Sequence, residues 1–325
     1  MTQPILITGA AGFIGFHLAK LLLMKGMPVI GFDNMNDYYD VSLKEARLSL
    51  LNEYEGFAFV RGDLADKAAV FALFSKYHPV VVVHLAAQAG VRYSIDCPDV
   101  YISANITGFF HILEACRYHP VKHLIYASSS SVYGGNEKVP FSTSDNVDQP
   151  ISLYAATKKS NELMARAYSH LYQIPATGLR FFTVYGPYGR PDMACFKFSD
   201  LIMGGKPIEI YNHGDMYRDF TYIDDIIGGI ERMLSSPPCD DSGTQHKVYN
   251  IGNNKPEHLL RFIELLEEKL GVKATKEFLP MQAGDVQRTY ADIDDLVADF
   301  DFKPQISIEE GLDRFVKWYR EYYKW

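Results

Sequence analysis

The sequence predicts an α/β fold in which a doubly wound parallel sheet is joined to a smaller mixed α/β domain. Up to residue 182, short apolar runs alternate with segments of helical spacing five or six times. A glycine-rich turn separates the first apolar run from the first helix. Beyond Gly186 the alternation stops and short strands mix with helices, which is typical of a second unit.

The expected elements follow from apolar periodicity and from the glycines and prolines that bound each run. Strands of the parallel sheet are expected over residues 4–8, 28–32, 57–61, 79–85, 121–126 and 176–182, with helices over 13–24, 41–54, 65–77, 98–119 and 154–172. In the second unit, helices are expected over 196–203, 223–234, 256–270 and 308–322, and strands over 208–211, 248–251 and 275–278. The predicted domains are 1–182 and, mainly, 183–325, with about 222–250 returning to the first.

The glycine turn predicts a dinucleotide site. Gly9, Gly12 and Gly15 lie between a buried strand and a helix, where such a site needs a tight turn, close approach to a pyrophosphate and close helix–strand packing. The N-terminus of the helix then faces the phosphates with free N–H groups. This placement indicates a Rossmann domain. The residues expected to line its cofactor site are Gly9, Gly12, Phe13, Ile14, Gly15, Asp33, Asn34, Asp63, Leu64, Leu85, Ala86, Ala87, Asn105, Tyr154 and Lys158.

Asp33 follows the second expected strand and favours NAD over NADP. A carboxylate at this point accepts hydrogen bonds from the adenosine ribose and repels a 2′-phosphate, and no arginine is adjacent in the sequence. The alternative is an aspartate that only caps a turn. Asp63, after the third strand, is placed to meet the adenine edge or to cap a loop.

A Tyr-x-x-x-Lys pair opens the helix over residues 154–172. Tyr154 and Lys158 are one turn apart and leave the helix on the same face. A nearby ammonium is expected to lower the pKa of the phenol, making an acid/base catalyst. The alternative is a rim tyrosine beside a solvated lysine. A run of four serines, 128–131, follows the fifth strand and places hydroxyls at the same sheet edge.

Composition limits the partners. The chain has 325 residues with a net charge of −8, which argues against nucleic acid as the main partner. No apolar run is long enough to cross a bilayer, and no signal peptide is expected ahead of the first strand. The four cysteines follow no metal-ligand spacing and are expected to be reduced thiols of a cytoplasmic protein, so no metal site is predicted.

Taken together, these motifs resemble the extended short-chain dehydrogenase/reductases, and the whole chain is similar to their nucleotide-sugar epimerases. Within these it is most similar to the UDP-glucuronate 4-epimerases. The similarity is carried by the runs at residues 33–40, 89–94 and 180–187, and by 284–286 together with 289–292. The resemblance implies C4 epimerisation of a UDP-hexuronate through transient oxidation to a 4-keto sugar by bound NAD. It also implies a homodimer formed through the helices at 98–119 and 154–172.

The resemblance also implies residue roles. Tyr154 is the general base and then the acid at the C4 hydroxyl, Lys158 binds the nicotinamide ribose, and Ser129 occupies the catalytic Ser/Thr position. Asn105 supports the cofactor site. Arg218 is expected at the pyrophosphate, Tyr211 near the uracil, and Asp285 and Arg288 at the uridine ribose or phosphates, while Gln282 replaces an arginine found in many relatives.

A glucuronate substrate adds a hazard, because its 4-keto intermediate is a β-keto acid that readily loses CO₂. Ser130, Ser131 and Thr183 are expected to hold the carboxylate with neutral hydrogen bonds, and Arg190 to bring charge close. Arg92 and these hydroxyls favour an acidic sugar. The alternatives are a UDP-galactose 4-epimerase, a UDP-glucuronate decarboxylase and a catalytically inactive NAD sensor. A 4,6-dehydratase is disfavoured because the serine loop lacks an Asp-Glu pair.

Overall fold

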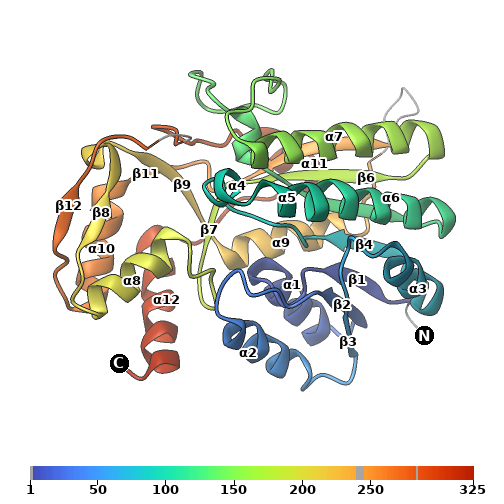
Figure 1. Ribbon diagram of the computed structural model, residues 1–325, viewed down its shortest axis with the longest axis horizontal. Helices are drawn as coiled ribbons and strands as arrows, with labels where there is room; N and C mark the ends of the chain where they lie inside the picture. The colour runs from blue at the N-terminus through green and yellow to red at the C-terminus, as the bar shows by residue number, and fades with distance from the viewer. Residues whose placement is uncertain (1–2, 239–244, 283–284) are drawn as a thin grey trace.

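A seven-stranded parallel sheet forms the centre of the protein (Figure 1). The structure is a computed structural model that describes residues 3–238, 245–282 and 285–325. The strand order is β10-β6-β5-β4-β1-β2-β3, and every pairing is parallel. The strands are β1 (Ile5–Thr8), β2 (Val29–Asp33), β3 (Phe57–Arg61), β4 (Val81–His84), β5 (His123–Ser129), β6 (Ala176–Phe181) and β10 (His246–Ile251).

Helices cover both faces of this sheet, which explains why its central strands are continuously apolar. On one face, α3 (Lys67–Tyr77), α6 (Gly108–Tyr118) and α7 (Leu153–Tyr172) bury one apolar cluster. On the other, α1 (Phe13–Met24), α2 (Val41–Leu51) and α9 (Ile223–Met233) pack into a second cluster. The chain runs outward from β1 to β3 and then crosses to β4 on the other side of β1, so a ligand crevice opens at the carboxyl ends of β1 and β4.

The single helix predicted over 98–119 is wrong in detail. The chain forms α4 (Tyr93–Asp96), α5 (Pro98–Tyr101), a π-helical stretch (Ile102–Thr107) and then α6. Asn105 lies in the π-helical stretch and hydrogen-bonds the backbone of Gln88, which belongs to the loop after β4. Such π-turns are frequent at functional sites, and here the turn places Asn105 behind the crevice.

The second part of the chain builds two small sheets. β7 (Thr183–Tyr185), β9 (Tyr217–Tyr222) and β11 (Pro256–His258) form one, and β8 (Ile208–Ile210) pairs with β12 (Lys276–Phe278) in the other. The remaining helices are α8 (Ala194–Met203), α10 (Leu259–Leu270), α11 (Asp294–Phe300) and α12 (Ile308–Tyr323). Figure 1 shows the β8–β12 pair, α8 and α10 at the end of the molecule away from α3.

Several predictions for this part are corrected by the structure. Residues 256–258 pair with β9 as a strand instead of opening the helix, because their backbone bonds go to residues 217–219. β7, β9 and α11 were not predicted, since short strands and a two-turn helix carry little periodicity. β10 joins the main sheet beside β6, and α9 packs against α1. The sequence also predicts a polar surface loop over residues 235–244, of which 239–244 lie outside the described residues.

Candidate active site

One cavity of about 680 Å³ opens at the carboxyl edge of the main sheet and extends between the two parts of the chain. The glycine turn and the ends of β2, β4 and β5 line one end of it. Residues from β7, α8 and the segments around Tyr211 and Asp285 line the other end. Its size is within the range of small-molecule sites.

The glycine turn fits a dinucleotide. Gly9 has a φ of +74°, and a Cβ on Gly15 would lie 2.1 Å from the carbonyl oxygen of Gly9, so both positions require glycine. Gly12 precedes α1 and caps it with no side-chain hydrogen bond, which leaves the first N–H groups of the helix open to the cavity. The turn therefore leaves backbone donors and room for a pyrophosphate.

Asp33 lies where a ribose carboxylate was predicted. It lines the cavity, is 7% exposed, and accepts hydrogen bonds from the backbone N–H groups of Ala11 (3.2 Å) and Met35 (2.9 Å). Its neighbour Asn34 donates to Asp63 at 3.0 Å. Lys44 of α2 also lines this end, with its ammonium held by Asn36. The sequence does not predict Lys44, because its helical position gives no sign that it faces inward.

Most of the other predicted cofactor residues line the same cavity, namely Phe13, Ile14, Leu64, Leu85, Ala86 and Ala87. Asn105 does not, since it is buried behind the wall. Its side-chain oxygen accepts from the N–H of Gln88 at 2.8 Å, and its amide donates to the carbonyl of Gln88 at 2.9 Å and to Thr157 at 3.1 Å. Asn105 therefore joins the loop after β4 to α7.

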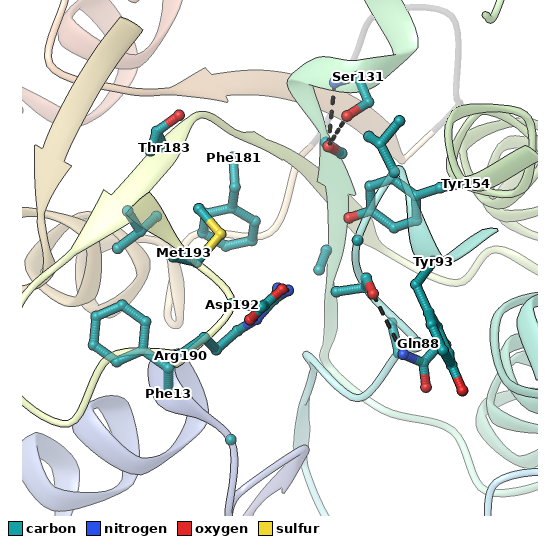
Figure 2. Close-up of a pocket in the computed structure, with 18 of the residues that line it drawn as sticks. Phe13, Gln88, Tyr93, Ser131, Tyr154, Phe181, Thr183, Arg190, Asp192 and Met193 are labelled. Carbon is teal, nitrogen blue, oxygen red and sulfur yellow. Dashed lines mark hydrogen bonds and ion pairs between the residues drawn. The ribbon is translucent and has the colours of Figure 1, made fainter. Parts of the chain in front are cut away.

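Tyr154 and Lys158 both line the cavity from α7, whose N-terminus is capped by Ser152. Figure 2 shows the Tyr154 hydroxyl turned into the cavity, with Thr183 and the Arg190–Asp192 pair on the facing wall. Lys158 is 2% exposed and donates to the carbonyl oxygen of Ala127 at 2.8 Å. Burial lowers the pKa of Lys158 to about 8.

Lys158 was expected to lower the pKa of the Tyr154 phenol, but Lys158 is not among the groups that shift this pKa. Burial raises the pKa of Tyr154 above its ordinary value, while the Ser129 hydroxyl and the positive charge of Arg190 act in the opposite direction. Because the Lys158 ammonium is turned to Ala127, the cation that lowers the pKa of Tyr154 in the protein alone is Arg190.

The structure separates the four serines. Ser128 is buried and donates to the carboxylate of Glu162 at 2.6 Å, so its hydroxyl is committed to a structural bond. Ser129 donates to the Ser131 hydroxyl at 3.1 Å, and together with Ser130 these residues line the cavity beside Tyr154. Of the four serines, Ser129 is the one whose hydroxyl interacts with the Tyr154 phenol and lowers its pKa.

Cations and hydroxyls gather at the other end. Arg92 forms an ion pair with Asp285 at 3.0 Å, and its guanidinium lies 4.9 Å from the centre of the Tyr211 ring. Arg218 donates to the carbonyl oxygens of Tyr217 and Gln287. The cavity at this end is lined by Arg92, Thr183, Arg190, Tyr211, Arg218 and Asp285.

Two predicted substrate residues do not reach the wall of the cavity. Arg288 packs its guanidinium over the ring of Tyr217 at 4.5 Å, and Gln282 is not among the lining residues. Tyr38 and Asp192 line the cavity near Arg190, and the sequence predicts neither of them as a site residue. Only their hydrogen bond, between residues 154 positions apart, identifies them.

A family model described as GDP-mannose 4,6 dehydratase matches residues 6–315. The chain belongs to this family. It is 56% identical to Protein CapI of Staphylococcus aureus, over 99% of this chain and 100% of the relative. It is 50% identical to a probable UDP-glucuronate 4-epimerase of Rhizobium meliloti, over 98% of this chain and 97% of the relative.

A solved structure gives the same family relationship. UDP-glucuronic acid 4-epimerase from Bacillus cereus, in complex with UDP-glucuronic acid and NAD, superposes with a TM-score of 0.91. The two chains are 35% identical, and the match covers 99% of this chain and 100% of that one. The seven-stranded sheet with its glycine turn is thus the sheet of this family.

No helix in the described ranges combines the length and the apolar character that a membrane span requires.

Proposed function

We propose that this protein is an NAD-dependent UDP-glucuronate 4-epimerase that interconverts UDP-glucuronate and UDP-galacturonate. The observation that carries the proposal is the single cavity, in which a dinucleotide cradle, Tyr154 with Ser129, and the cationic wall around Arg190 face the same space. The relatives named for this activity support the choice of substrate.

Tyr154 is proposed to take the proton of the sugar C4 hydroxyl and later to return it. The Ser129 hydroxyl is placed to relay or share that proton, because it lies beside the phenol and outside the bond that occupies Ser128. NAD, when bound, would supply a hydride acceptor at C4 and a positive charge that favours the phenolate. Lys158 would hold the ribose, and Asp33 the adenosine ribose, both from the wall of the cavity.

The second part of the chain is proposed to hold the UDP group while the sugar turns. Arg218 would bind the pyrophosphate, and Tyr211 and Asp285 the uridine. Anchoring the nucleotide more tightly than the sugar allows both faces of C4 to reach the same acceptor. This division of labour also supports the domain boundary at residue 182, with residues of about 222–250 belonging to the first domain.

Ser130, Ser131 and Thr183 are proposed to restrain the sugar carboxylate near the plane in which its C–C bond is poorly aligned to break. All three line the cavity, and Thr183 and Ser131 lie on opposite sides of it in Figure 2. Thr183→Ala is expected to release UDP-pentose beside the epimerised product. Product analysis without added UDP-pentose would place the restraint elsewhere.

The family description names a dehydratase, and elimination of water is the activity that it suggests. Expulsion of water from C5–C6 calls for acidic groups at the serine loop, and residues 129–131 are all serine. The lining carboxylates Asp192, Glu209 and Asp285 are each bonded to a partner side chain. The structure therefore favours epimerisation over dehydration.

The test is incubation of the protein with UDP-glucuronate, UDP-glucose and UDP-galactose separately, with the products resolved by NMR. Formation of UDP-galacturonate from UDP-glucuronate supports the proposal. Conversion of the neutral sugars alone would indicate a UDP-galactose 4-epimerase, and formation of UDP-pentose alone a decarboxylase. Binding with no turnover and no change in cofactor absorbance would indicate a sensor.

We also propose a homodimer formed by α6 and α7 with their preceding turns. Apolar side chains are exposed on these segments, with exposed fractions of 47% for Ile102, 38% for Phe110, 58% for Leu163 and 64% for Leu171. An exposed apolar face of this kind is typical of a protein interface. A cytoplasmic location is supported by free thiols at Cys97, Cys116 and Cys195, while Cys239 lies outside the described residues.

A further inference from the structure

The residues between β2 and α2 form a polar insertion with two adjacent tyrosines, which we term the tyrosine insertion (residues 36–40). It lies at the dinucleotide end of the cavity and has no role in the chemistry proposed above. Both of its tyrosines, however, are linked to the segment that follows β7, Tyr38 directly and Tyr39 through Arg47. We term this segment the arginine loop (residues 186–192) because it carries Arg190.

The first tyrosine reaches Arg190 through one carboxylate. The hydroxyl of Tyr38 donates to Oδ2 of Asp192 at 3.2 Å, and Asp192 accepts from Nε of Arg190 at 3.0 Å. A second bond joins Nη2 of Arg190 to Oδ2 of Asp192, so the carboxylate holds one edge of the guanidinium in a fork. Figure 2 shows Arg190 and Asp192 side by side in the cavity.

Tyr38 is itself held in place for this bond. Gly90 has a φ of +105°, and a Cβ on it would lie 2.8 Å from the Tyr38 hydroxyl, so the phenol fits only because residue 90 is glycine. Its ring packs against that of Tyr93 at 4.8 Å. Burial, followed by the charge of Asp192, raises the pKa of Tyr38 to about 12, so the hydroxyl remains a donor at neutral pH.

The second tyrosine reaches the same loop through a buried arginine. Arg47 has no exposed surface, and its guanidinium donates to the hydroxyl of Tyr39 at 2.7 Å. It also donates to the carbonyl oxygens of Tyr188 at 2.7 Å and Gly189 at 3.2 Å, immediately before Arg190. A fourth bond goes to the carbonyl of Ala11 in the glycine turn at 2.8 Å. The arginine loop is thus tied at two points to the dinucleotide end.

We propose that the tyrosine insertion, through Tyr38 and Asp192, positions the Arg190 guanidinium for the sugar carboxylate and so makes the site selective for a uronate. The inference rests on the proposed function and adds Tyr38 and Asp192 as the groups that orient the Arg190 guanidinium. Asp192 occupies only the Nε–Nη2 edge, and within the described residues Nη1 of Arg190 has no hydrogen-bond partner. Arg190 lines the cavity on the wall opposite Tyr154, and its Nη1–Nη2 edge can donate two hydrogen bonds to a second carboxylate.

The alternative is that the tyrosine insertion only packs against the arginine loop. In that case, losing one hydroxyl would change stability but would not distinguish ligands with and without a carboxylate. Tyr38 and Asp192 are positioning residues in the proposal, since they act on the substrate through Arg190. The distinguishing readout is therefore the ratio of affinities for UDP-glucuronate and UDP.

The experiment measures the dissociation constants of UDP and UDP-glucuronate by calorimetry, and the products by NMR, for four proteins. These are the wild type, Tyr38→Phe, Asp192→Asn and the control Tyr118→Phe, which removes an exposed hydroxyl on α6 that does not line the cavity. Melting temperatures confirm that each variant is folded. Tyr38→Phe is the most conservative change, so it tests the proposal even if Asp192→Asn does not fold.

The expected result is that UDP binds all four proteins within about twofold, while UDP-glucuronate binds roughly 3- to 10-fold more weakly to Tyr38→Phe and roughly 10- to 100-fold more weakly to Asp192→Asn. A fifth protein, the double variant Tyr38→Phe/Asp192→Asn, should bind UDP-glucuronate no more weakly than Asp192→Asn, because both residues act through the same hydrogen-bonded chain. Equal losses for UDP and UDP-glucuronate, or no loss for either ligand, would overturn the inference while leaving the epimerase assignment intact. A wild type that fails to convert UDP-glucuronate would overturn both.

Discussion

At the scale of single residues, the chemistry depends on how a buried phenol is surrounded. Tyr154 is buried enough that its pKa is raised, and the groups that counter this are a serine hydroxyl and an arginine from a distant segment. The lysine one turn away is turned to a backbone carbonyl instead. Helical spacing therefore places Lys158 near the reaction without determining where its charge acts.

Removing the phenol oxygen should stop proton transfer while leaving the ligands bound. Tyr154→Phe is expected to lower kcat with UDP-glucuronate by about 10²- to 10⁴-fold, the usual contribution of a positioned acid/base group. Dinucleotide content and UDP affinity should stay near those of the wild type. Steady-state kinetics and calorimetry measure both, with the exposed Tyr118→Phe as the control. Retention of most of the wild-type rate would remove Tyr154 from the mechanism.

The two neighbouring serines should respond differently to alanine. Ser129→Ala is expected to lower kcat about 10- to 100-fold with little change in stability, since its hydroxyl interacts with the Tyr154 phenol. Ser128→Ala leaves the buried Glu162 with one donor fewer and should cost about 1–3 kcal/mol in the free energy of unfolding. Urea unfolding and kinetics of both variants give the comparison. A reversed pattern would assign the catalytic role to Ser128.

Acid stability should depend on buried histidines. Burial lowers the pKa of His123 to about 4, so the folded protein keeps this imidazole neutral after the unfolded chain has taken up a proton near pH 6.5. The folded state therefore loses stability as pH falls from 6.5 to 4, by about 2–3 kcal/mol from this group. In His123→Gln, the difference in unfolding free energy between pH 7 and pH 4.5 should shrink by that amount. Parallel pH curves for variant and wild type would contradict the assignment.

At the scale of elements, the glycine turn and the network behind it explain how strands and helices meet at the cavity. Arg180 of β6 makes two bonds to Glu162 of α7, at 2.8 and 2.9 Å, and a third to Tyr133. Glu162 also accepts from Ser128, so β5, β6 and α7 are joined immediately behind the serine loop. Breaking this buried ion pair would leave an unpaired buried charge, which costs free energy. The pair therefore holds the catalytic edge of the sheet in place.

Gly15, the third glycine of the turn, lies where α1 packs closely on the turn after β1, so a side chain at this position should disrupt the packing. Gly15→Ala would bring a methyl group to 2.1 Å from the Gly9 carbonyl and shift the turn. The expected result is loss of bound dinucleotide, measured by absorbance of the purified protein, with a cost of about 1–3 kcal/mol in unfolding free energy. Gly228→Ala on α9 meets no atom within 4 Å and should stabilise the helix by about 0.5–1 kcal/mol. Equal behaviour of the two variants would contradict the close approach.

At the scale of the whole molecule, one apolar cluster continues from the α1 side of the main sheet into the second part of the chain. The cavity lies along this junction, so dinucleotide and sugar ends are built from segments far apart in the sequence. The outer face of α6 and α7 stays apolar and exposed, which is where a second copy is proposed to bind.

A charge on that face should produce monomers. Leu163→Glu places a carboxylate in the middle of the proposed interface, where its desolvation would oppose association. Light scattering after size exclusion should show the mass falling from two chains to one. Val272→Glu introduces the same charge at an exposed apolar residue after α10 and should leave the mass unchanged. An unchanged mass for Leu163→Glu would place the interface elsewhere or show that the protein is monomeric.

The sequence by itself determined the parallel sheet, the glycine turn and the Tyr154–Lys158 spacing, because each is a local pattern of apolar period, backbone freedom or helical repeat. Only the tertiary structure decided that Ser128 bonds Glu162, that Lys158 faces Ala127, and that Tyr38 holds Asp192. These contacts join residues 34, 31 and 154 positions apart. Periodicity repeats over a few residues and says nothing of such distances, so the direction in which each functional group points appears only when the chain is folded.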